Sequence, residues 1–271
     1  MKISFSTLAC PEWKLSEIIE MATNAGYEGI ELRFVQGEDS LWKLPVFQGS
    51  ELKSTKRALD QCGLAISCVD TSCRFHSPDR RERERWIEEG ERMADLAAEL
   101  GAPGIRVFGD QIQPGASRDS TRGWIEDCLR TLADRTCPNG IEIWIETHGD
   151  FATSIEAGAI LKNTARENCG VVWDPANSFI ESEEPPSRSA SALGKTIRHV
   201  HMKDLQRKGD GQWEPVLPGQ GMLPLSEMRT ALKMLRYDRF VSFEWEKKWH
   251  PSIADAAVAL PHFVEWFRAT G

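Results

Sequence analysis

A single (β/α)₈ barrel is the fold class that the sequence predicts, as one domain over residues 1–271. Two observations predict it. Short runs of β-branched or aromatic residues alternate with longer amphipathic stretches, and this alternation repeats eight times along the chain. Runs such as GIRVFG and CGVVW would be apolar on both faces of a strand, which is typical of parallel strands that helices cover. Eight repeats favour a closed barrel over an open sheet, and no Pro/Gly/Ser linker divides the chain.

Each predicted strand is a short run rich in β-branched and aromatic residues. In chain order, the predicted strands cover residues 3–7, 29–34, 65–71, 104–109, 142–147, 169–174, 197–203 and 240–244.

The stretches between these strands predict crossover helices. LSEIIEMATNAG and ERWIEEGERMADLAAELGA have apolar residues at i, i+3, i+4 and i+7 and a Gly close to the C-terminus. Residues 77–92, SPDRRERERWIEEGER, are charged enough to suggest a nucleic-acid arm. Their Arg and Glu alternate at spacings that allow i,i+4 pairs, which predicts a solvated helix face instead. Residues 181–194 contain Pro185 and Pro186 after an acidic run and predict a loop that leads into a short helix.

The composition favours a small-molecule partner. Hydrophobic residues make up 41% of the chain and charged residues 27%, as in a soluble globular protein. A formal net charge of −8 disfavours binding to nucleic acid or to an anionic membrane. Neither a signal peptide nor a run of about 18 apolar residues is found, so we expect a cytoplasmic location. The seven cysteines form no CxxC pair and indicate reduced thiols. The sequence leaves open whether the chain forms a homo-oligomer.

Polar residues stand at the ends of the last four predicted strands, where barrel enzymes place their active sites. These ends read IWIETHGD, VVWDPANS, HVHMKD and SFEWEKKWH, and they contain Glu146, Asp174, His201 and Glu244. Three carboxylates and one imidazole aimed at one point would repel one another unless a cation neutralised them. A mainly oxygen set with one imidazole suits Mn²⁺, Mg²⁺, Co²⁺ or Zn²⁺. The sequence therefore predicts one divalent metal ion of open identity.

The chain resembles the xylose isomerase-like barrels that are grouped as sugar phosphate isomerases and epimerases, from its opening KISFST and AGYEGIEL to its closing FVSFEWEKKWHP. In that family a Glu, an Asp, a His and a Glu on strands five to eight bind the metal, which implies Glu146, Asp174, His201 and Glu244 here. The resemblance also implies that Glu146 and Glu244 are the catalytic acid/base pair. They would move a proton next to the carbonyl of a sugar or keto-sugar, through an enediolate.

Two assignments at these strand ends stay open. Glu244 and Glu246 share a face, so the sequence does not decide which one reaches the metal; we prefer Glu244 because it directly follows the apolar run VSF. The interpretation of His199 as a satisfied core histidine competes with a role in binding. We expect substrate contacts from the remaining polar residues near the strand ends: His148, Asn177, His199, Lys203 and Glu246.

Other functions would use a similar site. A dehydratase or lyase acting on a keto-sugar, an inosose or a 3-keto-glycoside would need the same residues. An abasic-site endonuclease, as in the distantly related endonuclease IV, and a non-catalytic sugar-binding barrel are less favoured. Residues 217–225, LPGQGMLPL, place Gly219 and Gly221 where barrel enzymes often hold phosphate, although a plain turn explains them as well.

Overall fold

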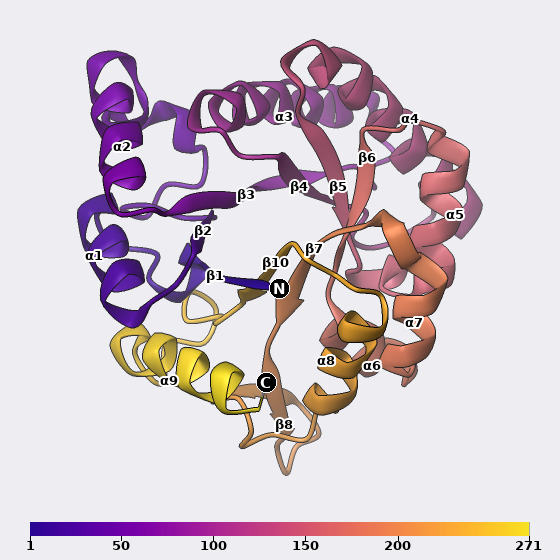
Figure 1. The fold of residues 1–271 in the computed structure, drawn as a ribbon. Coiled ribbons are helices and arrows are strands. Elements are labelled where there is room, and N and C mark those ends of the chain that lie inside the picture. The colour runs from indigo at the N-terminus through magenta and orange to yellow at the C-terminus, as the bar shows by residue number, and fades with distance from the viewer. Residues whose placement is uncertain (271) are drawn as a thin grey trace.

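Eight parallel strands close into a barrel that the helices surround, as the computed structural model of residues 1–270 shows (Figure 1). Around the barrel the strands follow the order β1, β2, β3, β4, β5, β6, β7, β10 and back to β1. The predicted (β/α)₈ barrel is therefore confirmed. The barrel strands are β1 (Lys2–Ser6), β2 (Gly29–Leu32), β3 (Ala65–Arg74), β4 (Gly104–Phe108), β5 (Glu142–Glu146), β6 (Cys169–Trp173), β7 (Ile197–Met202) and β10 (Phe240–Phe243).

Helices join successive strands and cover the outside of the barrel (Figure 1). They are α1 (Leu15–Ala25), α2 (Gly49–Gln61), α3 (Arg80–Leu100), α4 (Arg118–Thr136), α5 (Ser154–Thr164), α6 (Pro175–Ser182), α7 (Pro186–Leu193), α8 (Leu225–Met234) and α9 (Ala256–Ala269). Within residues 1–270, none of them combines the length and the apolar character that a bilayer crossing requires.

The charge-rich segment forms the first turns of α3, as predicted. The Asp79 side chain caps this helix by accepting a hydrogen bond from the Arg81 amide. The charges of α3 pair with the neighbouring helix α4, where Arg135 contacts Glu84 and Glu91, each at 2.8 Å. The segment is therefore a solvated helix face, and some of its charged residues form ion pairs with α4.

Two elements differ from the prediction. The structure has the short helix α7 near its expected place, but a further helix, α6, begins directly after Asp174. This helix was not predicted; Asp174 is its N-cap and Pro175 is its first residue. After β7 the chain also forms an antiparallel hairpin of β8 (Asp204–Arg207) and β9 (Trp213–Val216), which lies outside the barrel and was not predicted.

A small apolar plug lies inside the barrel. Trp144, Cys68 and Val172 form this plug, and all three are buried. Glycine makes room for it, because a Cβ atom at Gly104 would lie 2.7 Å from the Trp144 ring.

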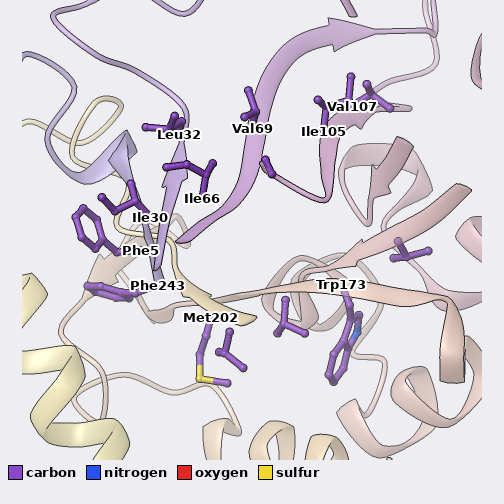
Figure 2. Close-up of a cluster of buried hydrophobic side chains, with 14 of the residues drawn as sticks. Phe5, Ile30, Leu32, Ile66, Val69, Ile105, Val107, Trp173, Met202 and Phe243 are labelled. Carbon is purple, nitrogen blue, oxygen red and sulfur yellow. The ribbon is translucent and has the colours of Figure 1, made fainter. Parts of the chain in front are cut away.

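The opposite face of each strand packs against the helices. Large apolar side chains from most of the strands form this outer core, and burying each contributes roughly 1.5–3 kcal/mol. Figure 2 labels ten of them: Phe5, Ile30, Leu32, Ile66, Val69, Ile105, Val107, Trp173, Met202 and Phe243. Because successive residues of a strand alternate between faces, this outer core directs the residues between them into the barrel.

Candidate metal centre

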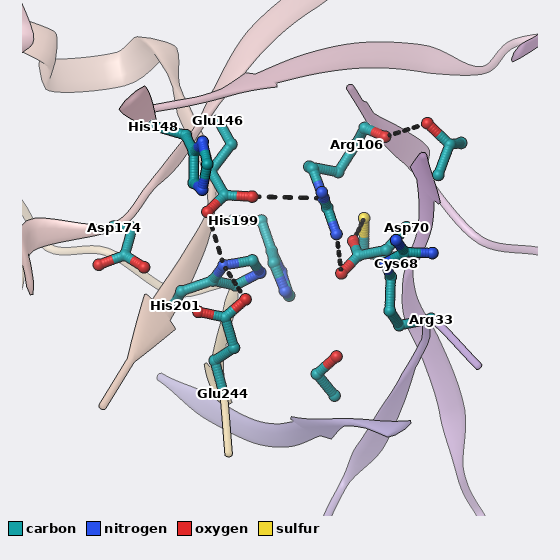
Figure 3. A network of polar contacts seen from close by, with 12 residues as sticks. Arg33, Cys68, Asp70, Arg106, Glu146, His148, Asp174, His199, His201 and Glu244 are labelled. Atoms are coloured by element: carbon teal, nitrogen blue, oxygen red, sulfur yellow. Dashed lines mark hydrogen bonds and ion pairs between the residues drawn. The ribbon is translucent and has the colours of Figure 1, made fainter. Parts of the chain in front are cut away.

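Four strand ends bring Glu146, Asp174, His201 and Glu244 together inside the barrel (Figure 3). Glu146 ends β5, His201 lies in β7, and the other two directly follow β6 and β10. Each residue offers one ligand atom, and these atoms all lie within 4.8 Å of one another. All four side chains are buried, with Glu244 the most exposed at 6%. The structure thus gathers the four residues that the sequence singled out.

The chemistry of this cluster fits a divalent cation. His201 Nδ1 makes no hydrogen bond within the described residues, and it lies 3.5 Å from Glu146 Oε1 and 3.4 Å from Glu244 Oε1. Burial lowers the pKa of His201, but the surrounding carboxylates outweigh burial and hold that pKa well above its ordinary value. Buried carboxylates that converge on one imidazole nitrogen form a donor set that a divalent ion would satisfy.

The Lys203 ammonium contacts two members of this cluster and the nearby Glu246. Its Nζ lies 2.9 Å from Asp174 Oδ2, 2.7 Å from Glu244 Oε2 and 2.8 Å from Glu246 Oε1. Burial lowers the pKa of Lys203, but the carboxylates outweigh burial and keep it well above the usual value, so the ammonium stays charged. One ammonium is thus shared by three carboxylates, and it ties the cluster to Glu246 at the edge of the site.

The structure separates Glu244 from Glu246. Glu244 lies within the cluster, whereas Glu246 bonds to Lys203 and places Oε2 3.4 Å from His250 Nε2 at the edge of the site. Burial raises the pKa of Glu246, but Lys203 and His250 outweigh burial and hold it at about 2. The geometry therefore favours Glu244 as the residue that reaches a metal.

Arg106 braces Glu146 from inside the barrel, a contact that the sequence analysis missed. Arg106 is 2% exposed, its Nε lies 3.3 Å from Glu146 Oε2, and its Nη2 donates to Asp70 Oδ2 at 3.0 Å. Burial raises the pKa of Asp70 to about 7 although Arg106 opposes this shift. The missed signal was a charged residue at an inward position of the otherwise apolar run GIRVFG.

His148 and Asn177 lie at the rim of the cluster. His148 Nδ1 contacts Asp110 Oδ1 at 3.2 Å, and its side chain is 41% exposed. Asp110 adopts a left-handed backbone conformation with φ of 62°, which is uncommon for a residue other than glycine. Asn177 Nδ2 donates to Thr147 O at 3.1 Å and to Glu146 Oε1 at 3.4 Å, so its amide faces the cluster.

His199 lies deeper than the other candidates for substrate contact. It is 1% exposed, its Nε2 pairs with Glu31 Oε2, and its ring stacks on Trp144 with 5.9 Å between centroids. This position corresponds to the core histidine that competed with a binding role in the sequence analysis. Glu31, the last residue but one of the AGYEGIEL segment, was not singled out by the sequence pattern.

The glycine loop before α8 closes on a carboxylate of the chain itself. Asp204 accepts hydrogen bonds from the backbone amides of Gly219 and Gly221, both at 2.9 Å, and of Leu223 at 3.3 Å. A Cβ atom at Gly221 would lie 2.2 Å from Asp204 Oδ1, so the close approach requires glycine. The loop is therefore a turn built around Asp204.

Comparisons with known proteins point to one family. A model of the xylose isomerase-like TIM barrel matches residues 19–269. Inosose isomerase of Bacillus velezensis is 22% identical over 253 residues, which cover 90% of this chain and 88% of that protein.

Solved structures of similar fold include the following three proteins. The probable 3-DHS dehydratase AsbF of Bacillus anthracis has a TM-score of 0.80 at 20% identity, with 99% of both chains covered. The IolI protein with a bound zinc atom has a TM-score of 0.81 at 20% identity, with 98% of this chain and 96% of that chain covered. D-allulose 3-epimerase of Methylomonas sp. in complex with D-allulose has a TM-score of 0.80 at 20% identity, with 100% and 97% covered.

Proposed function

This chain belongs to the xylose isomerase-like TIM barrel family, and we propose that it is a divalent-metal-dependent isomerase or epimerase of a sugar or keto-sugar. The observation that carries the proposal is the convergence of Glu146, Asp174, His201 and Glu244 within 4.8 Å. The similarity to an inosose isomerase and to a D-allulose 3-epimerase supports this reaction class.

The four converging residues would hold one metal ion. The zinc atom in the similar IolI protein supports a metal here, and Mn²⁺, Mg²⁺, Co²⁺ and Zn²⁺ all suit the donor set. When bound, such an ion polarises a substrate carbonyl and thereby acidifies the neighbouring C–H.

The chain's own residues would then move the proton. Glu146 and Glu244 approach from β5 and β10, and one would remove the proton from the substrate carbon while the other returns a proton to the resulting enediolate. Arg106 orients Glu146 and Lys203 orients Glu244, because each cation binds one oxygen of its carboxylate. At the rim, His148, Asn177 and Glu246 can exchange hydrogen bonds with substrate hydroxyls.

A dehydratase or lyase is the second candidate, because the chain also has the fold of a probable 3-DHS dehydratase. The same proton abstraction would then be followed by cleavage of the C–O bond one carbon further along, with loss of water or of an alcohol. The residues would keep their places, and only the fate of the enediolate would differ.

Turnover in D₂O with a defined metal tests the proposal. The protein is stripped with EDTA, reloaded with each of the four ions, and offered ketoses, inososes and 3-keto-glycosides. An isomeric product that carries solvent deuterium supports isomerisation or epimerisation, and an unsaturated product identifies the dehydratase or lyase. Activity that is indifferent to EDTA and reloading would contradict the metal-dependent mechanism.

Glu146→Gln and Glu142→Gln form a matched pair of variants for this assay. Both residues lie on β5, but Glu142 is not part of the cluster and pairs with Arg198 at a distance of 2.9 Å. We expect the first variant to lose turnover and the second to keep it. Equal activity in the two variants would argue against a catalytic role for Glu146.

A further inference from the structure

A buried carboxylate joins two histidines of β7 beneath the proposed metal site. Glu31 lies on β2, which β1 and β10 separate from β7 in the barrel, and none of its surface is exposed. Glu31 Oε1 lies 3.2 Å from His201 Nε2, and Glu31 Oε2 contacts His199 Nε2. Each oxygen of the carboxylate thus faces one imidazole nitrogen.

The two nitrogens of His201 face different partners. Nε2 faces Glu31, while Nδ1 faces Glu146 and Glu244. An imidazole that binds a metal ion is neutral and carries one hydrogen, and an ionised carboxylate can only accept a hydrogen bond. The hydrogen therefore belongs on Nε2, because a lone pair there would face the Glu31 oxygen in a site without solvent.

We infer that Glu31 is a positioning residue that fixes His201 in its Nε2–H tautomer and thereby presents the Nδ1 lone pair as the metal ligand. This inference rests on the metal site proposed above. Carboxylates that hold the second nitrogen of a ligand histidine orient its ring, and changing them typically weakens metal binding by about 10- to 100-fold.

His199 and Trp144 keep Glu31 in place. The His199 ring stacks on Trp144 with an interplanar angle of 16°, and Trp144 belongs to the apolar plug. The ring of His199 stands nearly perpendicular to that of His201, at 86°. The plug holds His199, His199 holds one oxygen of Glu31, and the other oxygen of Glu31 is left to hold His201.

A second ion between Glu31, His199 and His201 is the competing interpretation, because these residues also offer three ligand atoms within 4.8 Å of one another. The direct contact between Glu31 and His199 favours a hydrogen bond, since one carboxylate oxygen already meets one imidazole nitrogen there. The two interpretations predict different stoichiometries, one metal ion per chain or two.

Glu31→Gln tests the inference with little change in shape. The glutamine amide has one acceptor oxygen and one NH₂ donor, so it can accept a hydrogen bond from only one of the two histidines. Whichever histidine meets the NH₂ group must carry its hydrogen on Nδ1. We expect Zn²⁺ and Mn²⁺ to bind about 10- to 100-fold more weakly in calorimetric titrations of the EDTA-stripped variant.

Glu184→Gln is the matched control, because Glu184 is also a buried carboxylate and accepts a hydrogen bond from the Ser154 amide at 2.9 Å, outside the barrel interior. We expect its metal affinity to equal that of the unmodified protein, and urea unfolding establishes that both variants are folded. Long-range ¹H–¹⁵N NMR of the zinc-loaded unmodified protein reads the tautomer directly and does not depend on any variant. The expected spectrum shows His201 bound through Nδ1 with its hydrogen on Nε2.

The outcomes separate the two proposals. An unmodified protein that binds no divalent ion contradicts the proposed metal site itself. If it binds one ion but Glu31→Gln binds within twofold as tightly, or if zinc sits on Nε2 of His201, the positioning role is overturned. Binding of two ions per chain would also overturn it, by making Glu31 a ligand.

Discussion

Replacing Lys203 with methionine should move folding stability and metal affinity in opposite directions. The Lys203 ammonium lies between 2.7 and 2.9 Å from Asp174, Glu244 and Glu246, and methionine keeps an unbranched side chain without the charge. In the metal-free protein these carboxylates lose the cation that they share. Removing one partner of a buried ion pair costs about 3–5 kcal/mol, and we expect the free energy of unfolding at pH 7 to fall by about that amount.

Metal affinity should rise in the same variant, because Lys203 competes for a ligand oxygen. Asp174 Oδ1 accepts hydrogen bonds from the Ala176 and Asn177 amides at the start of α6, so Oδ2 is the oxygen left for a metal. Lys203 Nζ holds this same Oδ2 at 2.9 Å. We take this buried ion pair as comparable to a hydrogen bond to a charged group, at about 1.5–3 kcal/mol, so its loss should make metal binding roughly 10- to 100-fold tighter.

Urea unfolding of EDTA-stripped protein and calorimetric titration with Mn²⁺ measure the two effects. Lys247→Met is the control, because Lys247 follows the barrel strand β10 but bonds to Pro251 O, Ile253 O and Asp255 instead of the cluster. We expect it to leave metal affinity unchanged. Weaker or unchanged Mn²⁺ binding in Lys203→Met would refute the competition between the ammonium and the metal.

Three further changes follow from the same structure. Glu146→Gln should lower turnover by about 10²- to 10⁴-fold, since that range is typical for loss of an acid/base group, and initial rates on the substrate found in the screen would check this. In Glu246→Gln the loss of folding stability should depend on pH. Lys203 and His250 outweigh burial and hold the pKa of Glu246 at about 2. The contribution of Glu246 to folding stability is therefore complete above its ordinary pKa and is lost as the pH falls toward 2. Urea unfolding should therefore show the largest difference from the unmodified protein above pH 5 and a shrinking difference toward pH 3; a difference constant across this range would contradict it. Gly104→Ala should destabilise the fold by about 1–3 kcal/mol, because its Cβ would lie 2.7 Å from the Trp144 ring, and an unchanged urea midpoint would show that the plug can shift.

Strand ends were predictable because a buried carboxylate or imidazole stands out against an apolar run. Asp174 and His201 illustrate this. Asp174 directly follows β6 and His201 lies near the end of β7, and most of the other residues in these two strands are apolar. The sequence could not decide between Glu244 and Glu246 as the metal ligand, because residues two positions apart are expected on the same face of a strand. Both residues come after β10, which ends at Phe243, and only the structure places Glu244 in the cluster and Glu246 beside Lys203 and His250.

The supporting residues were harder to find because they lie inside the strands. Arg106 and Glu31 are single charged residues within short apolar segments, and their partners come from distant parts of the sequence. Only closure of the barrel brings Arg106 to Glu146 and Glu31 to His201. The cytoplasmic location stays a prediction and the oligomeric state stays open, since neither is decided by contacts within one chain.

The loop that Asp204 closes can be understood as an anion receptor that carries its own anion on a tether. A carboxylate attached to the end of β7 meets the Gly219 and Gly221 amides at an effective concentration on the order of millimolar or higher. A phosphate from solution would have to displace this tethered competitor and leave its charge without partners. We therefore expect this loop not to contribute to the binding of a phosphorylated substrate. Its amides instead hold Asp204, and thereby the end of the segment that carries Lys203, in place.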